Sequence, residues 1–284
     1  MTDQAHAQAA RTPKMLIEEM NRTRTPHHTA AVWFLGQESV VIKGGDRIIY
    51  VDPYLSDELE QKAGIQRAFP APLSPSDVGN ADVVLITHEH DDHMDLTTIS
   101  AIAKQNHRTI FVAPGCCHAA MREAGVAEDR LYAAECDRWK EYDGFRLKPI
   151  PAAHEELEET EHGHRYVGYM IDINGVMIYH AGDTVVYPGL LERLQEERID
   201  IGMVPINGGD AFRRQDGIVG NMDYREAAKM ASAAKFDLTI PLHYDVFAWN
   251  GERPGHFIDY CNEYDPYMKT KVMARTERLL YVKD

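Results

Sequence analysis

Three histidines and an aspartate lie close together in segment 87–93 (THEHDDH), which fits the pattern H-x-H-x-D-H. The apolar run DVVLIT at 82–87 leads into it and predicts a buried strand. Side chains two apart in an extended segment project to one side, so His88 and His90 share a face. Asp92 and His93 follow where the chain turns toward the next helix. Imidazole and carboxylate groups suit a cation such as zinc, so the motif predicts a metal site rather than a solvated polar turn.

Further metal-competent side chains follow other predicted strands. His154 follows FRLKPIPA at 145–152, Asp183 follows VMIYH, and His243 follows DLTIPL at 237–242. One such residue alone is more often a hydrogen-bonded surface group. Together with the motif, however, four strand ends supply seven candidate ligands, and we expect these ends to meet. The seven are His88, His90, Asp92, His93, His154, Asp183 and His243.

The elements that must position these residues are predicted from apolar patterning and turn signals. Strands are expected at 32–35, 39–43, 47–52, 82–87, 109–114, 145–152, 199–206 and 237–242, and a hairpin at Asn174-Gly175. Helices are expected near 13–22, 96–103, 117–124, 189–197, 223–235 and 256–264. Strand groups come first and then mix with helices in both halves, which favours two sheets covered by helices on their outer faces.

From Ala31 to the C-terminus, the motif and its later partners resemble the metallo-β-lactamase superfamily. The resemblance implies an α+β fold, a four-layer αββα sandwich with metals at one edge between the two sheets. It implies a hydrolase domain at 30–284, preceded by an extension at 1–29 that carries a short helix. A histidine at position 90, where the oxygen-reducing diiron branch has glutamate, favours a hydrolytic branch.

The same resemblance implies a role for each ligand of a centre with two divalent ions, Zn²⁺ or Mn²⁺. One ion would be held by His88, His90 and His154, and the other by Asp92, His93 and His243. Asp183 would bridge the two ions, and Asp52 in YVDPY would brace the site from outside. Asp92 and Asp183 are the expected catalytic carboxylates: Asp92 either shuttles a proton or acts only as a ligand.

The stretches WFLGQESVVIK, HAGDTVVYPG and PLHYDVFAWN are similar to the L-ascorbate-6-phosphate lactonase subfamily. That similarity implies hydrolysis of a lactone or ester of a small anionic, sugar-acid phosphate-like substrate. The subfamily lacks the histidine found here at 154, which favours a full dinuclear site and argues against a direct transfer of the subfamily's substrate to this chain. Two alternatives stay open: a metal-dependent phosphodiesterase, and a metal-binding subunit without turnover.

Substrate contacts are predicted on loops. Arg213 and Arg214 are candidates for holding a phosphate or carboxylate, because arginine pairs bidentately with such groups. Tyr244 is a candidate for the substrate oxyanion, with a half-buried structural tyrosine as the alternative. Segment 155–165 is either a lid over the site or a solvated loop. Cys116 and Cys117 are expected to play a hydrophobic role at a helix start.

Composition narrows the class of protein further. The 284 residues include 45 acidic and 30 basic side chains, a net charge of −15, which argues against nucleic acid as a partner. No apolar run approaches a membrane span, and no signal-peptide pattern is visible at the start. Four cysteines without a C-x-x-C pair favour a reducing, cytoplasmic compartment. The subfamily similarity also suggests a homo-oligomer.

Overall fold

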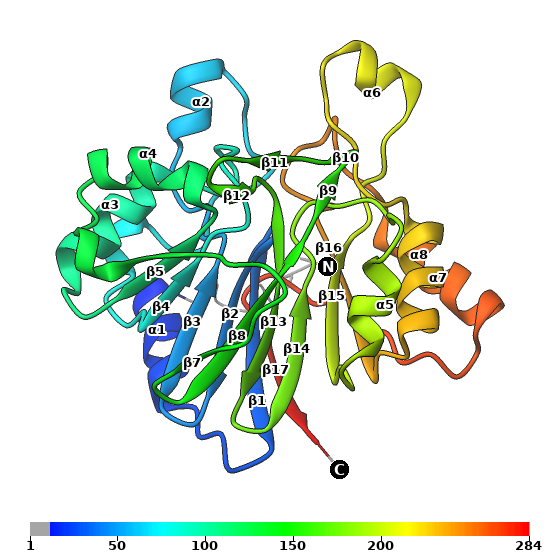
Figure 1. The fold of residues 1–284 in the computed structure, drawn as a ribbon, viewed down its shortest axis with the longest axis horizontal. Coiled ribbons are helices and arrows are strands. Elements are labelled where there is room, and N and C mark those ends of the chain that lie inside the picture. The colour runs from blue at the N-terminus through cyan, green and yellow to red at the C-terminus, as the bar shows by residue number, and fades with distance from the viewer. Residues whose placement is uncertain (1–11, 284) are drawn as a thin grey trace, which may run out of the picture.

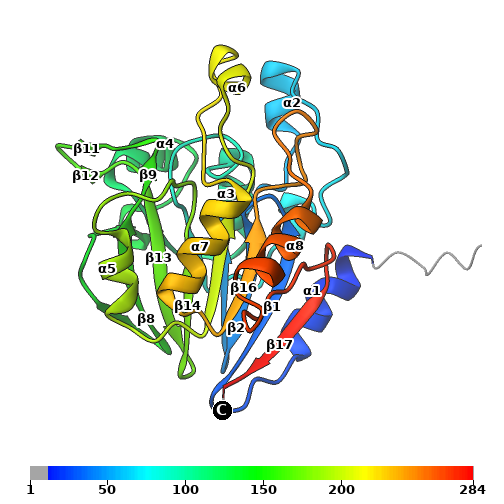
Figure 2. The same cartoon turned by 90° about the vertical axis from the view of Figure 1, so that its right-hand side faces the viewer.

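A computed structural model describes residues 12–283 of the chain. Two β-sheets pack face to face, and helices cover the outer side of each sheet (Figures 1 and 2). The expected four-layer αββα sandwich is therefore confirmed. Residues 1–11 of the predicted N-terminal extension lie outside the described residues.

The first sheet has seven strands in the order β17-β1-β2-β3-β4-β5-β6. Its bounds are β1 (Thr29–Gly36), β2 (Ser39–Gly44), β3 (Arg47–Val51), β4 (Val83–Leu85), β5 (Ile110–Ala113), β6 (Leu131–Ala133) and β17 (Arg278–Val282). Strands β17 to β3 pair antiparallel, and β3 to β6 pair parallel. The parallel pairs direct the carboxyl ends of β3 and β4 to one edge of the sheet.

The second sheet has six strands in the order β16-β15-β14-β13-β8-β7. Its bounds are β7 (Lys140–Tyr142), β8 (Phe145–Pro151), β13 (Val167–Ile173), β14 (Val176–His180), β15 (Ile201–Pro205) and β16 (Leu238–Leu242). The predicted hairpin joins β13 to β14, with Asn174 and Gly175 both at positive φ (55° and 82°). Strands β14, β15 and β16 run parallel, so their carboxyl ends also share an edge.

Side chains that point to alternate faces of the strands divide the core into layers. On β1 and β2, Phe34 and Ile42 belong to a cluster that fills the space between the sheets and continues under the helices of the second sheet. Trp33 and Val41 belong to the cluster under the helices of the first sheet. The outer helices are α1 (Pro13–Arg22), α3 (Leu96–Gln105) and α4 (His118–Glu123) on the first sheet, and α5 (Leu190–Gln195), α7 (Tyr224–Ala234) and α8 (Pro254–Tyr264) on the second. Each overlaps a predicted helix.

Two short helices were not predicted: α2 (Glu58–Ala63) and α6 (Ala211–Gln215). Neither contains a buried residue, so no apolar periodicity marks them. Three 3₁₀ turns lie at Pro75–Asp77, Gly115–Cys117 and Glu128–Arg130. Segment 155–165, expected as a lid or loop, forms parts of two small ladders, β9 (Ala153–His154) with β10 (Glu156–Leu157) and β11 (Glu159–Thr160) with β12 (Gly163–His164).

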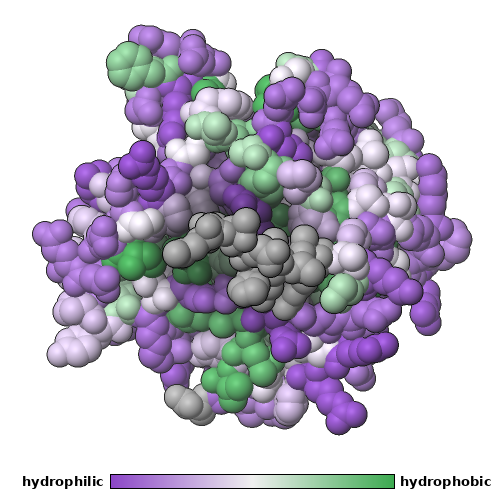
Figure 3. Space-filling model, turned by 180° about the vertical axis from the view of Figure 1, so that it is seen from behind, coloured by the Kyte–Doolittle hydropathy of each residue, from purple (hydrophilic) through white to green (hydrophobic). Residues whose placement is uncertain are grey.

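The helices α2 and α6 project from the same end of the molecule as the carboxyl ends of β15 and β16 (Figures 1 and 2). Seen from behind, the surface is mostly hydrophilic, with small separate apolar patches and a notch between two projections (Figure 3). A hydrophilic surface agrees with the net charge of −15. Among the described residues, no helix combines the length and the apolar character that a membrane span requires.

Cys117 is buried under the helices of the first sheet, and Cys116 packs against the same cluster. The expected hydrophobic role of this pair is therefore confirmed.

Candidate metal centre

The loop after β4 turns the motif residues back toward the sheet edge. The backbone N–H groups of His93 and Met94 both donate to the carbonyl oxygen of His90, at 2.9 and 2.7 Å. Asp95 then caps α3 by accepting from the Thr98 N–H at 3.0 Å. The same carboxylate accepts from the backbone N–H of Leu55 at 3.0 Å, which ties this loop to the one after β3.

Asp52 fixes the orientation of His93 from beneath. It adopts a left-handed backbone conformation at the end of β3, with φ 43°. Its carboxylate accepts from the Thr87 N–H at 2.8 Å and from the Thr87 hydroxyl at 2.6 Å, and it lies 2.7 Å from His93 Nδ1. A proton on Nδ1 leaves Nε2 of His93 as the free ligand atom. The structure thus places Asp52 where the resemblance expects the bracing residue.

The first group of candidate ligands consists of His88, His90 and His154, whose ligand atoms all lie within 4.8 Å of one another. His88 Nε2 lies 2.9 Å from His90 Nδ1. His154 Nδ1 lies 3.1 Å from the carbonyl oxygen of Gly220, the contact that a protonated Nδ1 makes, so Nε2 faces the site. The ring of Tyr166 packs beside the three imidazoles, at centroid distances of 5.3 to 6.1 Å.

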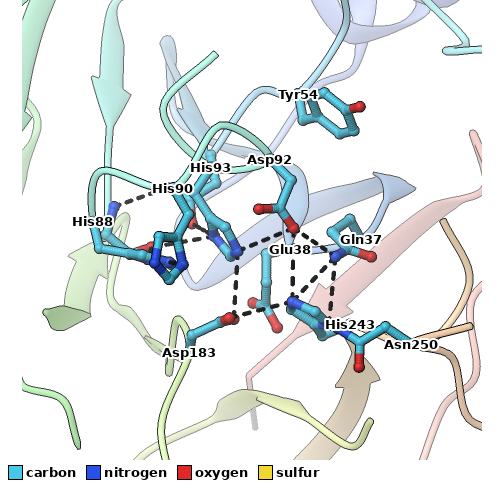
Figure 4. Close-up of polar contacts among 12 residues, drawn as sticks. Gln37, Glu38, Tyr54, His88, His90, Asp92, His93, Asp183, His243 and Asn250 are labelled. Atoms are coloured by element: carbon cyan, nitrogen blue, oxygen red, sulfur yellow. Dashed lines mark hydrogen bonds and ion pairs between the residues drawn. The ribbon is translucent and has the colours of Figure 1, made fainter. Parts of the chain in front are cut away.

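The second group consists of Asp92, His93 and His243, again within 4.8 Å of one another. His243 directly follows β16 and has a left-handed φ of 54°, which turns its ring into the site. Asp92 Oδ2 lies 3.6 Å from His93 Nε2 and 3.9 Å from His243 Nε2 (Figure 4). The three side chains come from two segments that are about half the chain apart in sequence.

Asp183 connects the two groups. Its Oδ2 lies 3.5 Å from His154 Nε2 and 3.3 Å from His243 Nε2. Its Oδ1 lies 3.5 Å from His93 Nε2, and the side chain is only 4% exposed. One carboxylate therefore faces a member of each group, which is the position expected for a bridging ligand. All seven predicted ligands meet at this point.

The electrostatic environment keeps two of the histidines neutral. Burial lowers the pKa of His88 well below its ordinary range and also lowers that of His154. Burial acts on His93 in the same way, but the neighbouring carboxylates of Asp183 and Asp92 outweigh it and raise its pKa well above the ordinary range. Without an ion, His93 thus carries the positive charge that balances these carboxylates.

Both carboxylates are kept ionised. Burial alone would raise the pKa of Asp183, but His243 and His93 beside it hold the pKa well below its usual range. The pKa of Asp92 is likewise lowered, because His93 and His243 outweigh the effect of burial. Anionic carboxylates and neutral imidazoles are the protonation states in which these groups bind metals.

Two unpartnered atoms test whether a divalent ion fits here. His93 Nε2 and Asp183 Oδ1 are buried and have no hydrogen-bond partner. Buried polar atoms are rarely left unpaired, so these two are accounted for if they coordinate a cation. The donor set of imidazoles and carboxylates matches zinc or manganese. The residues present therefore fit a divalent metal ion.

Two of the predicted substrate contacts, Tyr244 and Arg213, make other contacts within the protein. Tyr244 does not reach the site, because its ring stacks on Phe34 and its hydroxyl donates to the carbonyl oxygen of Met273 at 3.4 Å. The substrate role expected for Tyr244 is thus not supported, and the alternative structural role holds. Arg213 is occupied as well: its guanidinium donates to the carbonyl oxygens of Asn207 and Gly251.

Arg214 remains available near the site. Its Nε donates to Glu155 Oε1 at 3.0 Å, and Glu155 directly follows the candidate ligand His154. The Arg214 side chain is 59% exposed. It can therefore meet a substrate from the solvent side.

Two neighbours of the site were missed by sequence reasoning. Gln37, in the turn between β1 and β2, donates through Nε2 to Asp92 Oδ2 at 2.8 Å. Glu38 is fully buried, neither of its carboxylate oxygens has a hydrogen-bond partner, and Oε2 lies 3.3 Å from His180 Nε2. Their position in the sequence could have indicated this, because both follow a predicted strand, as the ligands do.

The fold and the two ligand groups define a metal-dependent hydrolase. Comparison with known families agrees: the Beta-lactamase superfamily domain matches residues 47–244, and the chain belongs to this superfamily. A UPF0173 metal-dependent hydrolase of Thermococcus kodakarensis is 28% identical over 230 residues, which is 80% of this chain and 89% of the relative. A probable L-ascorbate-6-phosphate lactonase of Escherichia coli O127:H6 is 23% identical over 268 residues, covering 82% of this chain and 74% of the lactonase.

Solved structures show the same fold at low sequence identity. Igni18, a metallo hydrolase from Ignicoccus hospitalis, has a TM-score of 0.69 at 19% identity and covers 90% of this chain and 100% of its own. An isothiocyanate hydrolase from Delia radicum gut bacteria has a TM-score of 0.70 at 16% identity and covers 88% of this chain and 98% of its own. These neighbours support the architecture alone.

Proposed function

We propose that this protein hydrolyses the lactone or ester bond of a small anionic substrate, such as a sugar-acid phosphate. The observation that carries the proposal is the meeting of the two ligand groups on Asp183. The distant similarity to a probable L-ascorbate-6-phosphate lactonase supports the substrate class. The expected cytoplasmic location and the homo-oligomer stay predictions.

The chemistry divides between the ions and the chain. When bound, two divalent ions lower the pKa of water toward about 7 and polarise a carbonyl oxygen. The histidines of the two groups would hold the ions, and Asp52 would keep His93 in the tautomer that binds. Asp183 is 4% exposed and anionic, which suits a bridging ligand rather than a proton carrier.

Asp92 is the better candidate for moving a proton. Its side chain is 16% exposed, four times as much as that of Asp183, so it is the carboxylate that meets incoming substrate. Water adds to the carbonyl carbon while Asp92 takes its proton, and the ring C–O bond then breaks. The proton passes from Asp92 to the leaving alkoxide oxygen, and a hydroxy acid is released.

Arg214 is the proposed contact for the anionic part of the substrate. Arg214 donates to Glu155, which directly follows the candidate ligand His154. A substrate bound at the metal centre would therefore bring its phosphate or carboxylate close to the Arg214 guanidinium. Arginine binds such groups bidentately. The pairing with Glu155 orients the guanidinium before substrate arrives.

A paired comparison of substrates tests the proposal. Metal-reconstituted protein is assayed with a neutral γ-lactone, a phosphorylated sugar-acid lactone and bis(p-nitrophenyl) phosphate, with His88→Ala as the inactive control. Turnover of the lactones, lost in His88→Ala, supports the proposal. Turnover of the phosphodiester alone would replace it with phosphodiesterase activity. Bound metal with no turnover of any of the three would favour a non-catalytic subunit.

A further inference from the structure

We propose that Gln37 is an additional ligand of the second ion, the one held by Asp92, His93 and His243, and that it binds through its side-chain carbonyl oxygen after the carboxamide rotates. This inference rests on the metal centre and is independent of which bond the protein hydrolyses. It assigns a metal-binding role to a residue outside the seven predicted ligands.

Gln37 points directly between two members of the second group. Its Nε2 lies 2.8 Å from Asp92 Oδ2 and 3.1 Å from His243 Nε2, and those two atoms lie 3.9 Å apart (Figure 4). The residue is only 2% exposed. The carboxamide thus occupies the space between a carboxylate and an imidazole that both face the expected ion.

The backbone of Gln37 is held in place by the segment that carries His243. Its N–H donates to Asp245 Oδ1 at 3.0 Å, and its carbonyl oxygen accepts from the His243 N–H at 3.0 Å. Gln37 also has a left-handed φ of 58°, an uncommon conformation for a residue other than glycine. Unfavourable conformations of this kind persist where surrounding contacts enforce them, often at functional sites.

The chemistry of the carboxamide explains the rotation. In the absence of a cation, its N–H group faces the anionic Asp92, which is a favourable hydrogen bond. An N–H group cannot face a cation bound to the same carboxylate, because its hydrogen is the positive end of the N–H dipole and is repelled by the cation. The terminal torsion of glutamine is broad and roughly two-fold, so the side chain can present oxygen in place of nitrogen without moving the backbone.

An amide oxygen would make the two ion sites chemically unequal. The first group contains three imidazoles, and the second contains two imidazoles and a carboxylate. Gln37 would add another oxygen to the second site. Carboxylate and carbonyl oxygens suit manganese, whereas imidazole suits zinc, so we expect the second site to bind Mn²⁺ with the help of Gln37.

Binding of Mn²⁺ to the whole protein tests this role. Metal-free wild type, Gln37→Met and Gln37→Glu are titrated with Mn²⁺, and free Mn²⁺ is measured by electron paramagnetic resonance. Methionine keeps the length of the side chain but has no carbonyl oxygen, whereas glutamate keeps an oxygen. His243→Ala identifies the second site, and Gln195→Met, at the exposed end of α5, is the surface control.

We expect Gln37→Met to weaken the same site that His243→Ala removes, by at least about 10-fold, and to leave the other site unchanged. Gln37→Glu should bind Mn²⁺ at least as tightly as wild type. Unchanged binding in Gln37→Met would reduce Gln37 to a structural residue, and tighter binding would show that it competes with the ion. Either result overturns the proposal. Unfolding of each variant in chelator shows whether that variant folds. If Gln37→Met does not fold, Mn²⁺ binding by Gln37→Glu is the test, and weaker binding than in wild type overturns the proposal.

Discussion

His93 Nε2 and Asp183 Oδ1 lie 3.5 Å apart, both are buried, and neither has a hydrogen-bond partner. The carboxylates beside His93 raise its pKa, so a proton balances the local negative charge in the metal-free protein. A divalent ion would take over that balance and satisfy both atoms. This relationship links the second ligand group to the bridging carboxylate.

Asp52 should control metal affinity although it is not a ligand. Asp52→Ala removes the acceptor for Thr87 and His93, which frees the His93 ring to rotate. We expect metal affinity to fall by about 10–100-fold, as measured by competition with a chromophoric chelator. Asp57→Ala, on the exposed part of the same loop, should leave the affinity unchanged. Equal losses in both variants would remove Asp52 from the bracing role.

His154 and His243 should each account for one ion. His154→Ala leaves the group Asp92, His93 and His243 intact, and His243→Ala leaves the histidines of the first group intact. Elemental analysis should therefore show about one ion per chain fewer in each variant than in wild type. Unchanged stoichiometry in His154→Ala would indicate a single-ion protein.

Arg214 and Arg213 should behave differently despite being neighbours. Arg214→Ala should raise KM for a phosphorylated lactone by about 10-fold and spare a neutral lactone, because only the first substrate offers a charged partner. Arg213→Ala should lower the free energy of unfolding by about 1–3 kcal/mol, since it leaves the carbonyl oxygens of Asn207 and Gly251 without their donor. If Arg214→Ala affected both substrates equally, its binding role would be lost.

Glu38 should destabilise the metal-free protein at neutral pH. Burial and the nearby charge of Asp183 raise the pKa of Glu38 well above its ordinary value of 4.5. The folded state therefore binds more protons than the unfolded state above that pH, and stability falls as the pH rises. Glu38→Gln should stabilise the metal-free protein at pH 7 by about 1–3 kcal/mol, and this gain should vanish below about pH 4.5.

Urea unfolding in chelator between pH 4 and pH 8 measures the effect of Glu38→Gln. Glu263→Gln, on the exposed side of α8, is the matched control and should show no such dependence on pH. A stabilisation by Glu38→Gln that stayed constant across this range would contradict the assignment.

The strands and the ligands were predictable because their signals are local. The run at 82–87 has four consecutive apolar residues, at 83–86, and Asn174-Gly175 is a strong hairpin turn. His154, Asp183 and His243 could be proposed because each follows a strand and the parallel strands of a sheet direct their ends to one edge. The resemblance to a superfamily then assigned each ligand to an ion.

The remaining features depend on packing that a single sequence does not display. Gln37 and Glu38 carry side chains that are common on surfaces, and only the fold shows that both are buried beside the ligands. Helix α6 has no buried residue, so its position could not be inferred from periodicity. Tyr244 follows a ligand in sequence, but its hydroxyl lies against Met273 because the chain turns at His243.

Anomalous diffraction from crystals of the metal-reconstituted protein locates each bound ion among its ligands. We expect two peaks in the anomalous difference map, one among His88, His90 and His154 and one among Asp92, His93 and His243, with Asp183 between them. A single peak, or no peak at fully reconstituted protein with these residues in the positions described, would contradict the dinuclear centre on which the proposed hydrolysis depends.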